Sequence, residues 1–170
     1  MKKYLILVLI VLLIGALTVS VLAGKTGQAG KSNVAHLYLY EKSPVDWEIV
    51  EDGAWGKMKY NLSGATFDFV FNGHGLAEGT EYTLIYYPDP WPGTGLICLG
   101  SGTVNEEGDI HIAESVDTGD LPTDADENVL LGAKIWLVLS DDVDCENAEM
   151  TGWTPTEYLF EYDQITFTEK

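Results

Sequence analysis

Arginine is absent from this chain of 170 residues. Lysine supplies all nine basic residues, against 27 acidic ones, and the formal net charge is −18. So negative a surface repels phosphate backbones and anionic lipid headgroups. The composition therefore predicts no nucleic-acid partner and disfavours binding to the surface of a membrane.

Cysteine is scarce, with Cys98 and Cys145 the only two. They form no CxxC motif, so neither a zinc knuckle nor a thioredoxin-type redox site is indicated. An even count in an exported protein suggests that the two form a disulfide, and two isolated thiols are the alternative.

Catalytic motifs are lacking as well. The three histidines, His36, His74 and His111, fit no metal-binding spacing. The sequence Gly-Ser-Gly at 100–102 lacks the frame of a nucleophile elbow, and Gly-Lys-Ser at 30–32 lacks the earlier glycine of a phosphate-binding loop. We therefore expect a protein that is not an enzyme and that has no obligatory cofactor.

A long apolar run occurs only at the N-terminus. Lys2 and Lys3 precede an uncharged segment, and Val21 and Ala23 stand at the positions that a signal peptidase reads. We expect residues 1–23 to be a signal helix that is cleaved after Ala23. An uncleaved anchor is the alternative, because residues 4–23 are long enough to span a bilayer. In either case the rest of the chain is secreted or held at the cell surface, outside the cytoplasm.

The remaining chain has the length of one domain. Residues 24–33 are rich in glycine and small polar residues and predict a flexible linker, so residues 34–170 form the domain. The apolar periodicity from residue 34 onward is two, which is typical of strands. It predicts that Met58, Tyr60 and Leu62 face inward, that 65–72 places Ala65, Phe67, Phe69 and Phe71 on one core face, and that 133–139 is a buried central strand.

The strand pattern also covers two less regular segments. Residues 46–49 alternate in the same way, and the last strand, 158–167, needs a bulge near Asp163 to keep its apolar residues inside. About eight or nine short strands, without a helical segment in the mature chain, predict an all-β antiparallel β-sandwich.

A local motif extends this prediction to an immunoglobulin-like Greek key. Residues 76–86 resemble the tyrosine corner of fibronectin type III domains, with Leu76 and Tyr82 in the positions that close one end of the core. Glu78 replaces a proline that is usual in this motif. The resemblance implies a fold and implies no ligand.

Most of the mature chain is also similar to an uncharacterised group of exported archaeal β-sandwich proteins. The segments that carry this resemblance are LYLYEK (37–42), FNGHGL (71–76), YYPDPWPG (86–93) and LSDDVDCEN (139–147). The resemblance implies an exported β domain and no particular activity.

Calcium is the one metal that the sequence suggests. Asp141, Asp142, Asp144 and Glu146 lie in one acidic loop, and calcium prefers many oxygen ligands. The loop lacks the glycine and the closing glutamate of an EF-hand, and a shorter cluster at 124–128 lacks them too. A solvated acidic loop is the alternative interpretation.

Trp91 and Trp153 lie in segments stiffened by proline and glycine, and tryptophans held in this way can stack on a sugar ring. A structural role in the core is the alternative. Asn61 begins the only N-x-S sequon, which permits glycosylation.

Three functions follow as expectations. The first is a non-enzymatic, immunoglobulin-like module of the cell surface or the medium, which contacts other envelope or matrix components and is stabilised by calcium. The second is a carbohydrate-binding module that uses Trp91 and Trp153 to bind a polysaccharide. The third is an extracellular hydrolase, for which the sequence offers many carboxylates but does not place any two at a working separation.

Overall fold

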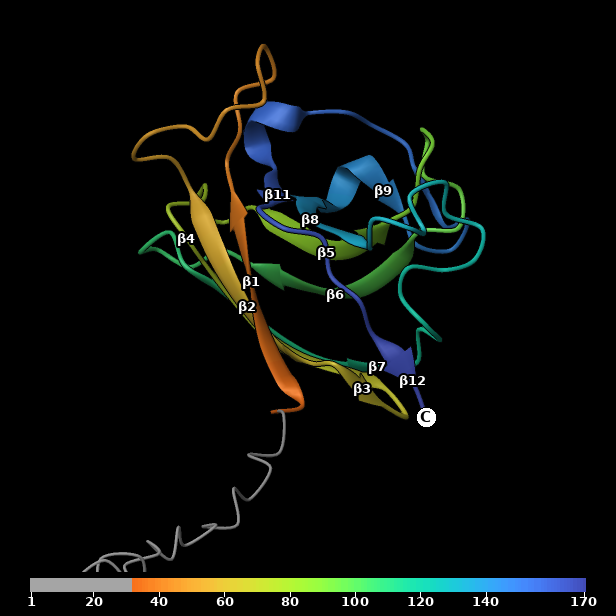
Figure 1. The fold of residues 1–170 in the computed structure, drawn as a ribbon. Helices are drawn as coiled ribbons and strands as arrows, with labels where there is room; N and C mark the ends of the chain where they lie inside the picture. The colour runs from red at the N-terminus through yellow and green to blue at the C-terminus, as the bar shows by residue number, and fades with distance from the viewer. Residues whose placement is uncertain (1–31) are drawn as a thin grey trace, which may run out of the picture. The chain divides into compact units, whose positions relative to one another are not determined.

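The computed structural model describes residues 32–170, which form an all-β domain (Figure 1). Two short 3-10 turns, η1 (Ser140–Asp142) and η2 (Pro155–Glu157), are the helical elements of this part of the chain. Within it, no helix has the length and apolar character needed to cross a bilayer. The expected signal segment, 1–23, and most of the expected linker lie outside the described residues.

Eight strands form one antiparallel sheet in the order β6-β5-β8-β11-β1-β2-β4-β7. Their bounds are β1 Val34–Tyr40, β2 Trp55–Asn61, β4 Phe67–His74, β5 Glu81–Tyr87, β6 Ile97–Thr103, β7 Ile110–Val116, β8 Lys134–Leu139 and β11 Leu159–Glu161. Two small sheets pair β9 (Val143–Asp144) with β10 (Glu149–Met150), and β3 (Ser63–Gly64) with β12 (Thr168–Glu169).

The large sheet coils so strongly that its two edge strands, β6 and β7, pack against each other. Gly100 and Gly102 make this approach possible, because a Cβ atom at Gly100 would lie 2.9 Å from Ile112 Cγ2. In Figure 1, β1, β2 and β4 form one side of the domain and β5, β6 and β8 the other. The result is a sandwich-like arrangement made from one continuous sheet rather than from two separately paired sheets.

The main core fills the inside of this coil and confirms the predicted alternation. Phe67, Phe69 and Phe71 of β4 are buried, as are Met58 and Tyr60 of β2. The outward residues between them, such as Lys59 and Val70, are exposed. Two predicted core positions are wrong, because both lie outside the regular strands. Leu62, predicted to face inward, follows β2 and is exposed, and Ala65, predicted to share the phenylalanine face, precedes β4 and is exposed.

A second apolar cluster lies on the opposite face of β5, β8 and β11. Ile85, Tyr87, Trp136, Val138 and Phe160 form most of it. Because both faces are covered, β5 and β8 are buried almost throughout, as the apolar run at 133–139 predicts. The segment 140–158 contributes Met150 and Tyr158 to this cluster and so covers this face.

The predicted disulfide is confirmed. Cys98 of β6 and Cys145 of the covering segment are bonded, with their Cα atoms 5.8 Å apart. The bond therefore ties the covering segment to an edge strand of the sheet.

Two of the less regular segments differ from the prediction. Residues 46–49 form no strand, because the Ser43 carbonyl accepts the Trp47 N–H at 2.8 Å and Trp47 adopts a positive φ of 60°. The predicted strand 158–167 is regular only over β11, which ends at Glu161. Beyond it, Ile165 and Phe167 form single bridges to Ala133 and Leu121. Both of these residues are nevertheless buried, as the predicted change of phase near Asp163 requires.

Candidate functional site: an aromatic pocket

The second apolar cluster is open at one end, where it forms a concave site of about 420 Å³ that we call the aromatic pocket. This volume lies within the range of small-molecule sites, roughly 300–1,000 Å³. Its lining consists of six aromatic and four charged residues: Trp47, Tyr87, Trp91, Trp136, Trp153, Phe160, Lys42, Asp89, Lys134 and Glu161. Four of the five tryptophans of the chain therefore meet at one site.

The floor of the pocket comes from three neighbouring strands. Tyr87 of β5, Trp136 of β8 and Phe160 of β11 project from the same face of the sheet and are buried. The Tyr87 and Trp136 rings are stacked with centroids 3.9 Å apart, and Phe160 meets Trp136 edge to face at 5.3 Å. Regular strands thus hold the floor rigidly.

The wall is made of three exposed tryptophans. Trp153 contacts Trp91 edge to face at 5.5 Å and Trp47 at 6.3 Å between ring centroids. Trp47, Trp91 and Trp153 are 49%, 53% and 43% exposed, so large apolar faces remain open to solvent. The structure therefore brings together the two tryptophans that the sequence singles out and adds a third.

Hydrogen bonds fix the loops that carry Trp91 and Trp153. The backbone N–H of Asp89 donates to Asp126 Oδ1 at 3.1 Å, close to the start of the Trp91 loop. Next to Trp153, the Thr154 N–H donates to the Tyr158 hydroxyl, which donates in turn to Asp142 Oδ2 at 2.5 Å. Burial together with this bond to Asp142 raises the pKa of Tyr158 well above its ordinary value.

The four charged groups of the pocket are not equally paired. Lys134 forms an ion pair with Asp89. The Lys42 ammonium group donates to the main-chain oxygen of Glu161 at 2.8 Å, rather than to its carboxylate. Within residues 32–170, the Glu161 carboxylate takes part in no ion pair, although both lysines line the same pocket.

The pKa of the Glu161 carboxyl also differs strongly from its ordinary value. Burial raises the pKa of its carboxyl to about 7, against smaller opposing effects of its own backbone N–H, Lys42, Trp136 and Lys134. Its Oε2 is buried without a hydrogen-bond partner, and so is Trp136 Nε1. The indole N–H thus lies near the carboxyl without completing a hydrogen bond. A perturbed, unsatisfied group of this kind in a pocket is a candidate for function.

The acidic loop predicted to bind calcium lies elsewhere. Asp141 lines a different hollow, while Asp142 is held by Tyr158. Asp144 accepts the backbone N–H of Asn147 at 2.9 Å, the side-chain amide of Asn147 at 2.7 Å and the backbone N–H of Glu146 at 2.9 Å, and these bonds lower its pKa. Within residues 32–170, no three His, Cys, Asp or Glu side chains group as a metal site would.

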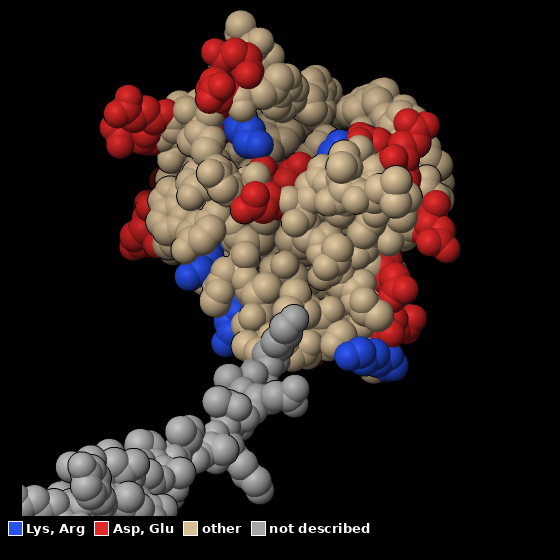
Figure 2. Space-filling model, in the orientation of Figure 1, with Lys and Arg blue, Asp and Glu red and all other residues tan. Residues whose placement is uncertain are grey.

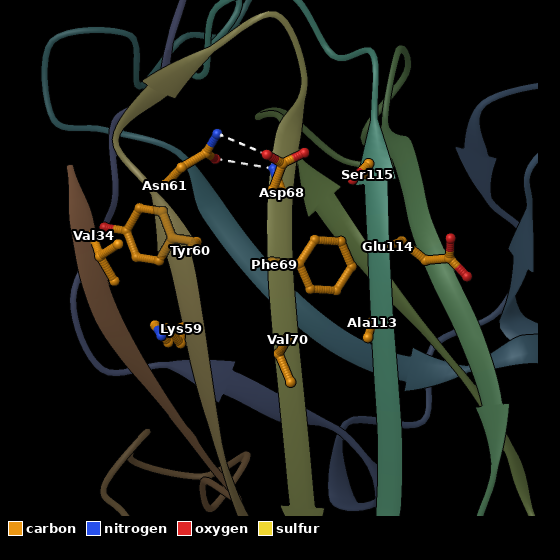
Figure 3. Close-up of a pocket in the computed structure, with 10 residues that line it drawn as sticks. All are labelled: Val34, Lys59, Tyr60, Asn61, Asp68, Phe69, Val70, Ala113, Glu114 and Ser115. Carbon is orange, nitrogen blue, oxygen red and sulfur yellow. Dashed lines mark hydrogen bonds between the residues drawn. The ribbon is translucent and has the colours of Figure 1, made fainter.

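Another hollow lies along β1, β2, β4 and β7, with a volume of about 690 Å³ (Figure 3). It contains Asn61, the residue of the sequon. Asn61 Oδ1 accepts the Asp68 N–H at 2.9 Å, and its Nδ2 donates to the Thr66 carbonyl at 2.9 Å. The Asn61 amide therefore closes the turn between β2 and β4, and the residues of this hollow include no buried unpartnered atom.

Sequence reasoning misses the other residues of the aromatic pocket for identifiable reasons. Trp136 lies in an apolar run that indicates only a core strand, and Glu161 alternates with aromatic residues as an ordinary surface residue would. The sequence does contain one indication of the pocket: the carboxylate of Glu161 lies within the aromatic run 158–162. Only the strand order brings residues 42, 91, 134 and 161 together.

No family model matches the chain, and no curated protein is similar to it. Any function must therefore be argued from the site itself.

Proposed function

We propose that this protein is a non-enzymatic module of the cell surface or the extracellular medium that binds carbohydrate in the aromatic pocket. One observation carries the proposal: Trp91 and Trp153 contact each other and line one pocket with Trp47 and Trp136. The C–H faces of a pyranose ring pack well on indole rings, and the charged groups at the same site offer partners for hydroxyl groups.

A binding role fits the charges of the pocket better than hydrolysis. Glycosidases use two carboxyl groups on either side of the bond that they cleave. Asp89 and Glu161 both line the pocket, but Asp89 is engaged with Lys134. Glu161 is left as the one carboxylate of the pocket outside an ion pair, which supports recognition rather than a two-carboxylate mechanism.

Export is part of the proposal. The disulfide between Cys98 and Cys145 is compatible with an oxidising location outside the cytoplasm. In Figure 2, acidic side chains lie mostly around the rim of the visible face, with separate lysine patches among them. The excess of 27 acidic residues over nine lysines suits a protein that must stay soluble in the medium. A C-terminal tag that antibody reaches on intact cells, or that appears in the medium, would support this location, and a tag found only inside cells would contradict it.

The finer fold assignment, an immunoglobulin-like Greek key, is likewise a proposal. Leu76 and Tyr82 are both buried in the main core. Burial raises the pKa of the Tyr82 hydroxyl, and a hydrogen bond with the backbone of Ala77 partly opposes this rise. These contacts support a tyrosine corner. They do not bear on the choice of ligand.

Titration with soluble polysaccharides and oligosaccharides, followed by tryptophan fluorescence, tests the binding proposal. We expect a saturable change that is lost in Trp91→Ala and Trp153→Ala. Trp55→Ala is the matched control, because Trp55 is 39% exposed and lies outside the pocket, against His74. If no carbohydrate changes the fluorescence, or if Trp55→Ala abolishes the change as fully, the proposal is wrong.

A further inference from the structure

The aromatic pocket contains a buried carboxyl group, that of Glu161, which forms no ion pair within residues 32–170. Its two lysines are the nearest sources of positive charge, but Lys134 pairs with Asp89 and Lys42 donates to the main chain of Glu161. The Glu161 carboxylate is mostly buried, and its Oε2 lacks any partner. Leaving a buried carboxylate unpaired is costly, so such groups are usually paired with a cation.

The rings around Glu161 suit a cation as well. Trp136 and Phe160 belong to the floor of the pocket that Glu161 lines, and Trp47 and Trp153 belong to its wall. The faces of aromatic rings attract positively charged nitrogen, and tryptophan does so most strongly. Rings of this kind around a carboxylate can bind an ammonium group from several sides at once.

The charges of the whole chain and of the pocket also favour the approach of a cation. The whole chain carries a net charge of −18, so its summed potential concentrates cations near the surface. Inside the pocket, Asp89 offsets Lys134, and an ionised Glu161 offsets Lys42, which makes the four charges sum to zero. With Glu161 ionised, an incoming cation therefore meets no excess of positive charge, and the cation itself favours the ionised form of the carboxyl.

We propose that the ligand of the aromatic pocket carries a positively charged nitrogen, as the amino sugars of a deacetylated polysaccharide do, and that Glu161 binds this nitrogen. The inference rests on the proposed carbohydrate function and specifies its ligand. The pyranose rings stack on Trp91 and Trp153, and the ammonium group forms a charge-assisted hydrogen bond with the Glu161 carboxylate.

The first test compares three trisaccharides with the full-length protein at neutral pH: one of glucosamine, one of N-acetylglucosamine and one of glucose. All three present similar pyranose faces, but only the first carries ammonium groups. We expect the glucosamine trisaccharide to bind about tenfold more tightly, or better, than the two neutral ones. Equal affinities would overturn this inference and leave the carbohydrate function intact, whereas no binding by any of the three would overturn both.

The second test removes the charge of Glu161. Glu161→Gln keeps the shape of the side chain, and we expect it to reduce the binding of the glucosamine trisaccharide to that of the neutral ones. Glu106→Gln removes the same charge from an exposed hairpin turn and should leave the preference unchanged. If Glu161→Gln retains the preference, or if Glu106→Gln loses it equally, Glu161 does not bind the nitrogen and the inference is wrong.

Discussion

The hydroxyl group of Tyr86, in β5, donates a hydrogen bond of 2.7 Å to Asp126, 40 residues further along the chain. Asp126 is 2% exposed, and its other oxygen accepts the backbone N–H groups of Asp89 and Asn128. One buried carboxylate thus joins a central strand to the two loops beside the aromatic pocket. Asp126, part of the shorter acidic cluster of the sequence, is bonded on both oxygens to groups of the protein itself.

Replacing Tyr86 by Phe should therefore destabilise the fold. The change removes the donor to Asp126 and the acceptor of the Thr123 N–H, and it leaves a buried carboxylate oxygen without that partner. We expect a loss of about 1–3 kcal/mol in the free energy of unfolding, measured by denaturant titration. Tyr162→Phe, at an exposed position, is the control and should change it little. Equal stabilities of the two variants would show that the Asp126 bond contributes nothing.

The disulfide should stabilise the part of the fold that carries Trp153. Cys145 lies in the segment that covers the outer face of β5, β8 and β11, and Cys98 lies in β6. Reduction, or the double change Cys98→Ser with Cys145→Ser, should lower the free energy of unfolding by about 2–4 kcal/mol. Unfolding curves with and without reductant measure the effect. The double variant should not respond to reductant, and a response from it would point to another cause.

Calcium is testable at the acidic loop. Asp142 is hydrogen-bonded to Tyr158, and Asp144 accepts both the side-chain amide of Asn147, at 2.7 Å, and two backbone N–H groups. Because these bonds close the loop without a metal ion, we expect the melting temperature to be the same in calcium and in a chelator. A rise in calcium that disappears in Asp144→Asn would instead establish the site that the sequence suggests.

The strands with clean alternation could be predicted from the sequence. Met58, Tyr60 and the three phenylalanines of β4 are buried as expected, since each alternates with polar or exposed residues along a regular strand. The pairing of the two cysteines follows from their number. Local patterns were sufficient here. The alternation of a strand is contained in its own few residues, and two cysteines can form only one intramolecular pair.

The aromatic pocket could be predicted only in part. Proline and glycine around Trp91 and Trp153 indicate stiff loops, but nothing local shows that these loops meet. Trp47 follows a strand-like alternation, yet a turn at Pro44 and a backbone bond to Ser43 place it at the pocket wall. The strand order, which brings β8 between β5 and β11, decides these contacts, and it is not visible in any one segment.

Glu161 makes a further prediction, because its burial ties stability to pH. The pKa of its carboxyl is raised to about 7 in the folded protein from an ordinary value near 4.5. Between these two pH values the folded state holds a proton that the unfolded state has released. The stability that protonated Glu161 contributes is therefore fully present below the unfolded pKa, near 4.5, and is lost as the pH rises through the folded pKa, about 7.

Glu161→Gln resembles the protonated form at every pH, so it should be more stable than the natural protein in mildly alkaline solution, by on the order of 3 kcal/mol. Near pH 4 the two proteins should unfold with nearly equal free energies. All other acidic groups titrate alike in both proteins, so the difference between their denaturant-unfolding curves isolates Glu161. Glu106→Gln should show no such difference, and a Glu161→Gln variant that gains nothing at high pH would mean that this carboxylate is well solvated or paired. A gain would show instead that the fold retains a charge that weakens it, as expected of a residue kept for binding rather than for stability.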